Sequence, residues 1–175
     1  MNLSDHNNNL GRFFEDYAVG DIITHATPRT LTEADASLYI SIYPTRFALQ
    51  SSAEFARNCG LKDRPLDDLI VFHTVFGKTV PDISINAVAN LGYAEGKFSN
   101  MVFSGETLSV KSEIIGLKQN SSGKTGIVYV KTKGQNSSGE TILEYKRWVM
   151  VKKRFVGVED MPSNLPHLKT SLNGS

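Results

Sequence analysis

In the second half of the chain, residues suited to a buried core alternate one by one with polar residues. The alternation runs from Leu108 to Ile114, recurs over 127–131 and returns from Leu143 to Val151. A period of two predicts antiparallel strands with one face on a core. Two near-identical tetrapeptides, Asn120–Gly123 and Asn136–Gly139, separate the three segments and have the turn chemistry of hairpin connections. Their repetition reflects turn requirements and not a duplicated domain.

The first half has the pattern of helices. Residues 67–80 (DDLIVFHTVFGKTV) are apolar on nearly all sides, which predicts a buried helix, and Pro81 is expected to end it. Thr32 followed by Asp35 is a helix-start signal for a helix that reaches residue 42.

Shorter elements flank these helices. Residues 52–59 predict a second short helix that ends at Gly60, and the stretch 43–50 (YPTRFALQ) lies between the two short helices as a loop. Residues 22–31 predict a strand that Pro28 confines to an edge or a bend.

One buried helix followed by an antiparallel meander predicts an α+β architecture in which a sheet wraps around a long central helix. Such a sheet leaves edges and one face without cover. We therefore expect a homodimer, or a heterodimer with a similar half.

Composition narrows the class of protein. The 175 residues are 40% hydrophobic and 21% charged, which is typical of one globular domain, expected here over 12–155 between a disordered N-terminus (1–11) and a flexible tail (156–175). A formal net charge of +1 gives no basic field for nucleic acid. There is no bilayer-length apolar run and no secretory signal, so we predict no membrane association. The single cysteine, Cys59, suits a cytoplasmic location and is predicted to be inert.

Four segments share the framework of a known family: RFFEDYAVGD, RTLTEAD, the DRP before the central helix, and FSGETL. They resemble the MaoC-like hydratases, which have the hot-dog fold. Longer runs, such as TPRTLTEADASLYISIYP and VFGKTVPDISINAVANLGYAEG, are similar to the N-terminal half of the mesaconyl-CoA hydratase (β-methylmalyl-CoA dehydratase) branch of that family. The resemblance covers residues 11–154.

The resemblance implies addition of water to an α,β-unsaturated acyl-CoA thioester, or its removal, without a metal or redox cofactor. It also implies an Asp and a His in a D-x-N-P-x-H loop after the first helix. The matching positions here are Thr45 and Gln50, with Phe47 and Ala48 between them. A hydroxyl and a carboxamide hold water but have no pKa near neutrality with which to move its proton. Longer family members consist of two hot-dog halves of which one carries the acid/base pair, and this chain resembles the other.

Asp68 and His73 are the remaining candidates for catalysis. Asp67 and Asp68 lie at the start of the central helix, where the resemblance implies a thioester site and where simple capping is the alternative. Asp68 is the first candidate for a substitute base, which requires a pKa raised by burial. His73 is better explained as a core residue than as a catalyst, and a spacing of five does not place it on the helical face of Asp68.

The predicted substrate-contacting residues are Tyr43, Thr45, Gln50 and Asn90. We predict no metal, because the four histidines show no ligand spacing. Lys97, Lys131, Lys146 and Arg147 are weak candidates for a CoA phosphate, since exposed strand cations usually serve solubility.

The sequence thus favours a half of an acyl-CoA hydratase or dehydratase, acting on a mesaconyl-CoA-like or β-methylmalyl-CoA-like substrate with a catalytic partner half. Two alternatives remain. One is a non-catalytic acyl-thioester binding or scaffold protein, and the other is an enzyme that uses Asp68 alone.

Overall fold

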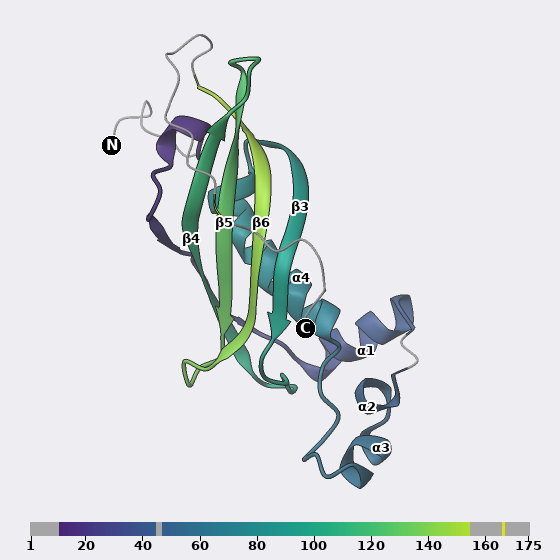
Figure 1. The fold of residues 1–175 in the computed structure, drawn as a ribbon. Helices are drawn as coiled ribbons and strands as arrows, with labels where there is room; N and C mark the ends of the chain where they lie inside the picture. The colour runs from purple at the N-terminus through teal and green to yellow at the C-terminus, as the bar shows by residue number, and fades with distance from the viewer. Residues whose placement is uncertain (1–10, 45–46, 155–165, 167–175) are drawn as a thin grey trace, which may run out of the picture.

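The computed structural model describes residues 11–44, 47–154 and 166, and its centre is one six-stranded antiparallel sheet (Figure 1). The strand order is β1-β4-β5-β6-β3, and the short β2 also pairs with β4. The strands are β1 (Ile22–Thr24), β2 (Arg29–Thr30), β3 (Ala87–Phe98), β4 (Thr107–Gln119), β5 (Thr125–Gln135) and β6 (Thr141–Lys152).

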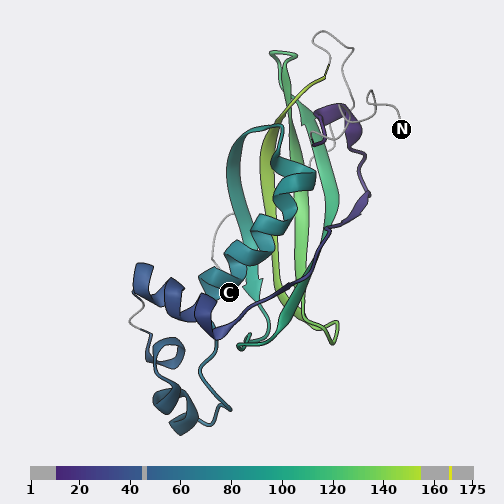
Figure 2. The same cartoon turned by 180° about the vertical axis from the view of Figure 1, so that it is seen from behind.

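A single long helix lies across the concave face of this sheet (Figure 2). It is α4 (Asp68–Thr79), and it continues into a π-helical segment, η3 (Val80–Ser84). Three short helices group beyond one end of the sheet, near the N-terminus of α4 (Figure 1). They are α1 (Glu33–Ile42), α2 (Ala48–Ser51) and α3 (Ala53–Asn58), and a 3-10 turn, η2 (Phe14–Asp16), precedes β1. The predicted α+β architecture, a sheet wrapped around a central helix, is confirmed.

The core lies between α4 and the inner faces of the strands. Ile70, Val71 and Val75 of α4 pack in one buried cluster with Leu108 of β4 and Tyr145 of β6. A second buried cluster fills the other end of the sheet and includes Phe14, Ile83, Ile114, Val128 and Val149. All three predicted strands of the second half are confirmed, and burial alternates along each of them. In β5, however, the buried positions are Gly126, Val128 and Val130, and the predicted positions Ile127, Tyr129 and Lys131 lie on the other face of the strand.

The helix helps to explain why β5 carries a glycine at position 134. A Cβ built on Gly134 would lie 2.6 Å from Cγ2 of Val75, which is closer than real Cβ contacts allow. The missing side chain lets the helix approach the strand, so close packing between α4 and the sheet depends on this position.

Local signals begin the helices where the sequence places them. Thr32 caps α1 and forms a capping box with Asp35, and Asp67 accepts a hydrogen bond from the backbone N–H of Leu69 at 2.8 Å at the start of α4. Gly60 follows α3 with φ +87°. These three expectations are confirmed.

Two tight turns connect β4 to β5 and β5 to β6 as predicted. Gly123 and Gly139 both have positive φ, and each donates its backbone N–H to the carbonyl of the asparagine three residues earlier at 3.0 Å.

Four features differ from the sequence prediction. The α-helix α4 ends at Thr79, before Pro81, as predicted, but the chain then continues as the π-helical segment η3, which the sequence did not predict. Residues 48–50 of the predicted loop belong to the one-turn helix α2 (Ala48–Ser51). The strand β3 was not predicted at all. The expected strand over 22–31 is split into β1 and β2, with Pro28 in the gap.

The remaining expectations concern the ends of the chain and membranes. The predicted disorder of 1–11 and of 156–175 falls almost entirely outside the described residues and stays a prediction. Every helix among the residues that the structure describes is too short or too polar to cross a bilayer.

Candidate functional site

The first candidate site lies at the N-terminus of α4, where Asp68 meets the side chain of Gln50. Gln50 is only 7% exposed although it is a polar residue in a short helix. Burial raises the pKa of Asp68, and the charge of neighbouring Asp67 raises it further. A hydrogen bond with the Gln50 side chain opposes this rise. The two residues that the sequence proposed, one as a substitute base and one at the position of the family's histidine, are therefore brought together.

Arg64 helps to hold Gln50 in this position. Its guanidinium donates to the backbone carbonyl of Gln50 at 3.3 Å and forms an ion pair with Glu33 of α1. Because Arg64 lies in the segment just before α4, one side chain links α1, α2 and the start of the central helix.

An open pocket of about 340 Å³ lies beside this site. The predicted substrate-contacting residue Tyr43 lines it, and the rings of Tyr39 and Tyr43 are 5.1 Å apart between centroids. Its other lining residues are Ile42, Pro44, Asp67 and Leu69. The prediction for Thr45 lies outside the described residues.

His73 lies on α4 but does not join Asp68. His73 is exposed, so the expectation of a core residue is wrong, and its ring lies 6.2 Å from the Tyr39 ring and 5.9 Å from the Phe72 ring, between centroids. Within the described part of the chain, no hydrogen bond or ion pair connects it to Asp68. Five residues of helix turn the two side chains to different faces, as the spacing predicts.

Asn90 lies at the other end of the central helix. Its side-chain oxygen accepts a hydrogen bond from Arg147 at 3.2 Å, and the same guanidinium donates to Thr79 at 2.9 Å. Thr79 is eleven residues beyond Asp68, which is about 16 Å along a helix. The structure thus does not place Asn90 with Gln50 and Asp68, and a role for it in substrate contact stays a prediction.

A buried chain of polar groups crosses the sheet near this end. The ring of His25 lies 2.7 Å from Oδ2 of Asp82 and 2.8 Å from Oγ of Ser112, which in turn lies 2.9 Å from Oγ1 of Thr132. This is the order of groups in a serine nucleophile relay. Ser112 is only 1% exposed, however, so its hydroxyl cannot reach an acyl group. The arrangement satisfies polar groups inside the core.

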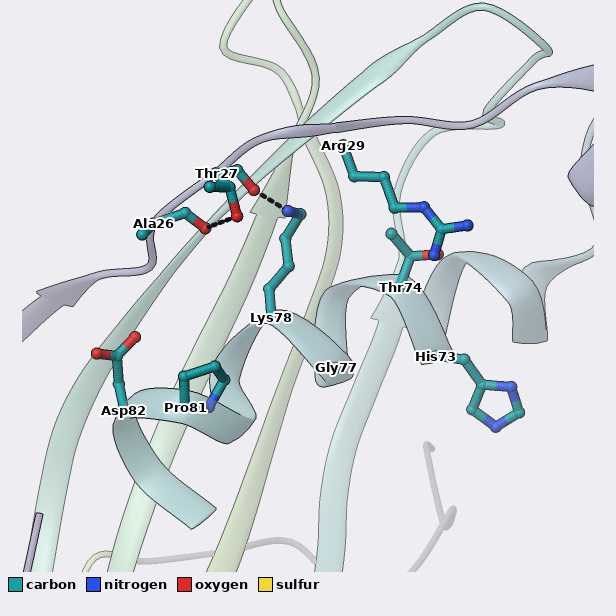
Figure 3. A pocket seen from close by; sticks show the side chains of 9 residues that line it. All are labelled: Ala26, Thr27, Arg29, His73, Thr74, Gly77, Lys78, Pro81 and Asp82. Atoms are coloured by element: carbon teal, nitrogen blue, oxygen red, sulfur yellow. Dashed lines mark hydrogen bonds between the residues drawn. The ribbon is translucent and has the colours of Figure 1, made fainter. Parts of the chain in front are cut away.

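A second pocket was missed by the sequence analysis. It lies between residues 26–29 and α4 and is lined by Lys78 and Arg29 among others (Figure 3). The polar side chains on the otherwise apolar helix α4 are a sign of this pocket. Its opposite wall comes from a segment about fifty residues earlier in the chain, however, so no local pattern could indicate the whole pocket. In the part of the chain that the structure describes, no three His, Cys, Asp or Glu side chains gather as a metal site.

The wrapped sheet and central helix define a class of protein, the hot-dog fold, and solved structures support this assignment. The chain superposes with a TM-score of 0.91 on a MaoC domain protein dehydratase from Chloroflexus aurantiacus, at 55% identity over 94% of this chain and 47% of that chain. A Mycobacterium tuberculosis protein with a double hotdog fold matches with a TM-score of 0.77, at 19% identity over 88% of this chain and 47% of that chain, and shows the fold alone.

The chain belongs to the mesaconyl-CoA hydratase family, whose model matches residues 3–163. It is 54% identical over 167 residues to the mesaconyl-CoA hydratase of Cereibacter sphaeroides, covering 95% of this chain and 49% of the relative. It is 56% identical over 165 residues to the beta-methylmalyl-CoA dehydratase of Chloroflexus aurantiacus, covering 90% of this chain and 47% of the relative. The chain spans about half the length of these curated relatives. The resemblance to MaoC-like hydratases that the sequence indicated is confirmed.

Proposed function

We propose that this chain is the substrate-binding half of an acyl-CoA hydratase or dehydratase that acts on a mesaconyl-CoA-like or β-methylmalyl-CoA-like thioester. A second hot-dog half supplies the acid/base pair. One observation carries the proposal: the buried Gln50, at the position where the family resemblance implies a histidine, contacts Asp68 at the start of the central helix.

The chemistry follows from what an amide can do. Hydration of an enoyl thioester requires one group to take a proton from water and another to deliver one to carbon. The amide of Gln50 donates and accepts hydrogen bonds but exchanges no proton near neutral pH. It can hold a substrate or a water molecule, and the proton transfers then fall to groups outside this half.

The partner half is expected at strand β3. This strand pairs with β6 on one side, and its other edge has no partner strand in the part of the chain that the structure describes. Four large apolar or aromatic side chains of β3 are between 41% and 55% exposed, namely Val88, Leu91, Tyr93 and Phe98. A long apolar edge of this kind favours pairing with another strand. The partner is either the second half or, in its absence, another copy of this chain.

The proposed reaction also has consequences for cofactors, location and partners. Adding water to a double bond is redox-neutral overall, so we expect no cofactor beyond the CoA thioester substrate and no metal. An exposed free thiol at Cys59 is compatible with a reducing cytoplasm. Neither nucleic acid nor a membrane is expected as a partner.

A second candidate function has one observation in its favour. Because burial and Asp67 raise the pKa of Asp68, this carboxyl is a better base than an exposed aspartate. An enzyme that works with Asp68 alone would nevertheless lack a separate proton donor, since His73 lies on another face of the helix. A non-catalytic thioester-binding protein is the third outcome that an experiment must distinguish.

The test is an assay of mesaconyl-CoA hydration, followed as loss of enoyl-thioester absorbance. The chain is assayed alone and after coexpression with the remaining half of the Chloroflexus relative. We expect turnover only with the second half present. Turnover by the chain alone that disappears in Asp68→Asn would support the single-base enzyme. Binding of the thioester without turnover under either condition would support the binding protein.

A further inference from the structure

The pocket between residues 26–29 and α4 has a volume of about 360 Å³ and is separate from the pocket at the N-terminus of the helix (Figure 3). One wall is the segment that links β1 to β2, and the other is the last turns of α4 with the start of η3. The lining residues are Ala26, Thr27, Arg29, His73, Thr74, Gly77, Lys78, Pro81 and Asp82.

Two cations reach into this space from opposite walls. Lys78 extends from α4 toward the carbonyl of Thr27 and donates a hydrogen bond to it, while Arg29 projects from β2 toward Thr74 (Figure 3). Arg29 has an acidic partner, because its Nη2 lies 2.7 Å from Oδ1 of Asp35. For Lys78 no carboxylate lies within 4 Å among the described residues. Burial lowers its pKa, and the charge of Arg29 lowers it further.

The other titratable groups of the pocket do not neutralise Lys78. Asp82 directs Oδ2 to the buried ring of His25 at 2.7 Å. The ring of His73 points away from Lys78 and Arg29 (Figure 3). The pocket therefore carries one ammonium group that is partly removed from water and whose only hydrogen-bond partner among the described residues is a carbonyl.

The backbone of Thr27 is held in an unfavourable conformation at this place. Its φ is +58°, in the left-handed region that β-branched residues rarely adopt. In this conformation its hydroxyl donates to the carbonyl of Ala26 at 2.7 Å and its own carbonyl accepts from Lys78. Strain of this kind persists only where the surroundings hold it, and it is concentrated at ligand sites.

We propose that this pocket binds an oxyanion of the substrate, with Lys78 as its principal counter-ion and Arg29 in support. The inference rests on the proposed function only for the source of the oxyanion, which is either the free carboxylate of the acyl group or a phosphate of CoA. An ammonium that is partly desolvated and lacks an acid gains from a charge-assisted hydrogen bond to either group.

The distance between this pocket and the N-terminus of α4 decides which part of the substrate, the CoA phosphate or the acyl carboxylate, would reach Lys78. Lys78 follows Asp68 by ten residues, or about 15 Å along the helix. If a thioester lies at the N-terminus of α4 and its pantetheine arm runs along the helix, a CoA phosphate comes within reach of Lys78, because such an arm has about the reach of four extended residues, roughly 14 Å. A thioester held near Gly77 would instead place the acyl carboxylate there.

The experiment uses unreactive probes, so it does not depend on turnover. Mesaconate and adenosine 3′,5′-bisphosphate are titrated separately into the isotope-labelled chain, and the amide signals of Thr27, Gly77 and Lys78 are followed by NMR. We expect one probe to shift these signals and to raise the pKa of the Lys78 ammonium. The probe that binds identifies the source.

Three variants complete the test. Lys78→Met should weaken binding about tenfold or more, Lys78→Arg should retain most of it, and Lys118→Met, on the exposed face of β4, should bind like the parent chain. Amide dispersion reports that each variant is folded. Binding that Lys78→Met leaves unchanged, or no shift with either probe, overturns the inference. Oxyanion binding without hydration in the coexpressed pair would instead reject the proposed function and leave this site standing.

Discussion

The guanidinium of Arg147 lies 4.8 Å from the centre of the Phe76 ring and is fully buried. Its two amino groups donate to the side chains of Asn90 and Thr79. Among the described residues no carboxylate lies within 4 Å of it, so a ring face and neutral oxygens surround the charge. Burial accordingly lowers the pKa of Arg147 from its ordinary value.

Removing this charge should cost little if the volume is kept. The Thr79 hydroxyl also donates to the carbonyl of Phe76 at 2.7 Å, and Asn90 is exposed, so neither group is left without a partner. We expect Arg147→Met to change the free energy of unfolding by less than about 1 kcal/mol or to increase it. Arg147→Ala should lower it by about 3 kcal/mol through the cavity that it leaves. Urea unfolding measures both, and an equal loss in the two variants would show that the charge itself stabilises the fold.

The pKa of Asp68 should respond to its two neighbours in opposite directions. Asp67→Asn removes a negative charge but keeps a capping side chain, so it should lower the pKa of Asp68. Gln50→Leu removes a hydrogen bond to the carboxylate and should raise it. NMR titration of the labelled Asp68 carboxyl measures each shift. Shifts of the same sign in both variants would contradict the site described here.

The buried His25 should make stability depend on pH. Burial lowers its pKa in the folded state, with Asp82 acting in the opposite direction and Arg147 and Arg12 adding to the decrease. The neutral ring is therefore favoured on folding, and its contribution is fully present above about pH 6.5, the ordinary histidine pKa. It is lost as the pH falls from there toward the folded-state value, because the unfolded chain takes up the proton first.

The corresponding variant is His25→Gln, which keeps hydrogen-bonding capacity without titrating. Between pH 7.5 and 5 the free energy of unfolding should fall more steeply for the parent chain than for the variant. Parallel curves would assign the pH dependence to other groups.

The contact between Gly134 and Val75 allows a double-mutant cycle. Gly134→Ala should lower the free energy of unfolding by about 1–3 kcal/mol, because its Cβ would overlap a stiff side chain. In a Val75→Ala background the same change should cost much less, since space has been made for it. Thermal or urea unfolding of the four chains gives the coupling energy. A coupling near zero would mean that the helix moves away from the strand instead.

The edge of β3 should control association. Leu91→Lys places a charge on a strand side chain that is 41% exposed, and it should weaken binding to the second half. Ile22→Lys, on the three-residue strand β1 at the opposite edge, is the matched control and should have no effect. Light scattering after size-exclusion chromatography, with and without the second half, measures association. Loss of association in the β1 variant would move the interface to that edge.

Sequence reasoning succeeded where a local pattern determines local structure. The capping pair Thr32 and Asp35 and the two Asn-Ser-Ser-Gly turns specify their conformations with neighbouring residues alone. The buried face of β4 follows from alternation because one side of that strand faces the core. Gln50 and Asp68 were identified through the family resemblance, and their contact depends on how α2 lies against the start of α4.

The failures have a different physical origin. Strand β3 is an edge strand with register shifts, so core burial imposes no regular alternation on it. The α-helix α4 ends before Pro81 as predicted, but the π-helical turn η3 that follows was missed, because such turns are rare and have no simple sequence pattern. The pocket at Lys78 is formed by Thr27 and the helix together, and its Thr27 wall was predicted only as part of a strand with a bend.

Strand β3 pairs with β6 through three interruptions, after Ala87, Asn90 and Ala94, and Glu95 has φ +52°. An interrupted strand offers its outer hydrogen-bonding groups in short sets and not as a continuous ladder. A matching strand must carry breaks at corresponding places to use them all. This geometry selects against indiscriminate addition of strands, so an assembly that grows from this edge is expected to close after one well-matched neighbour and not to extend into fibres.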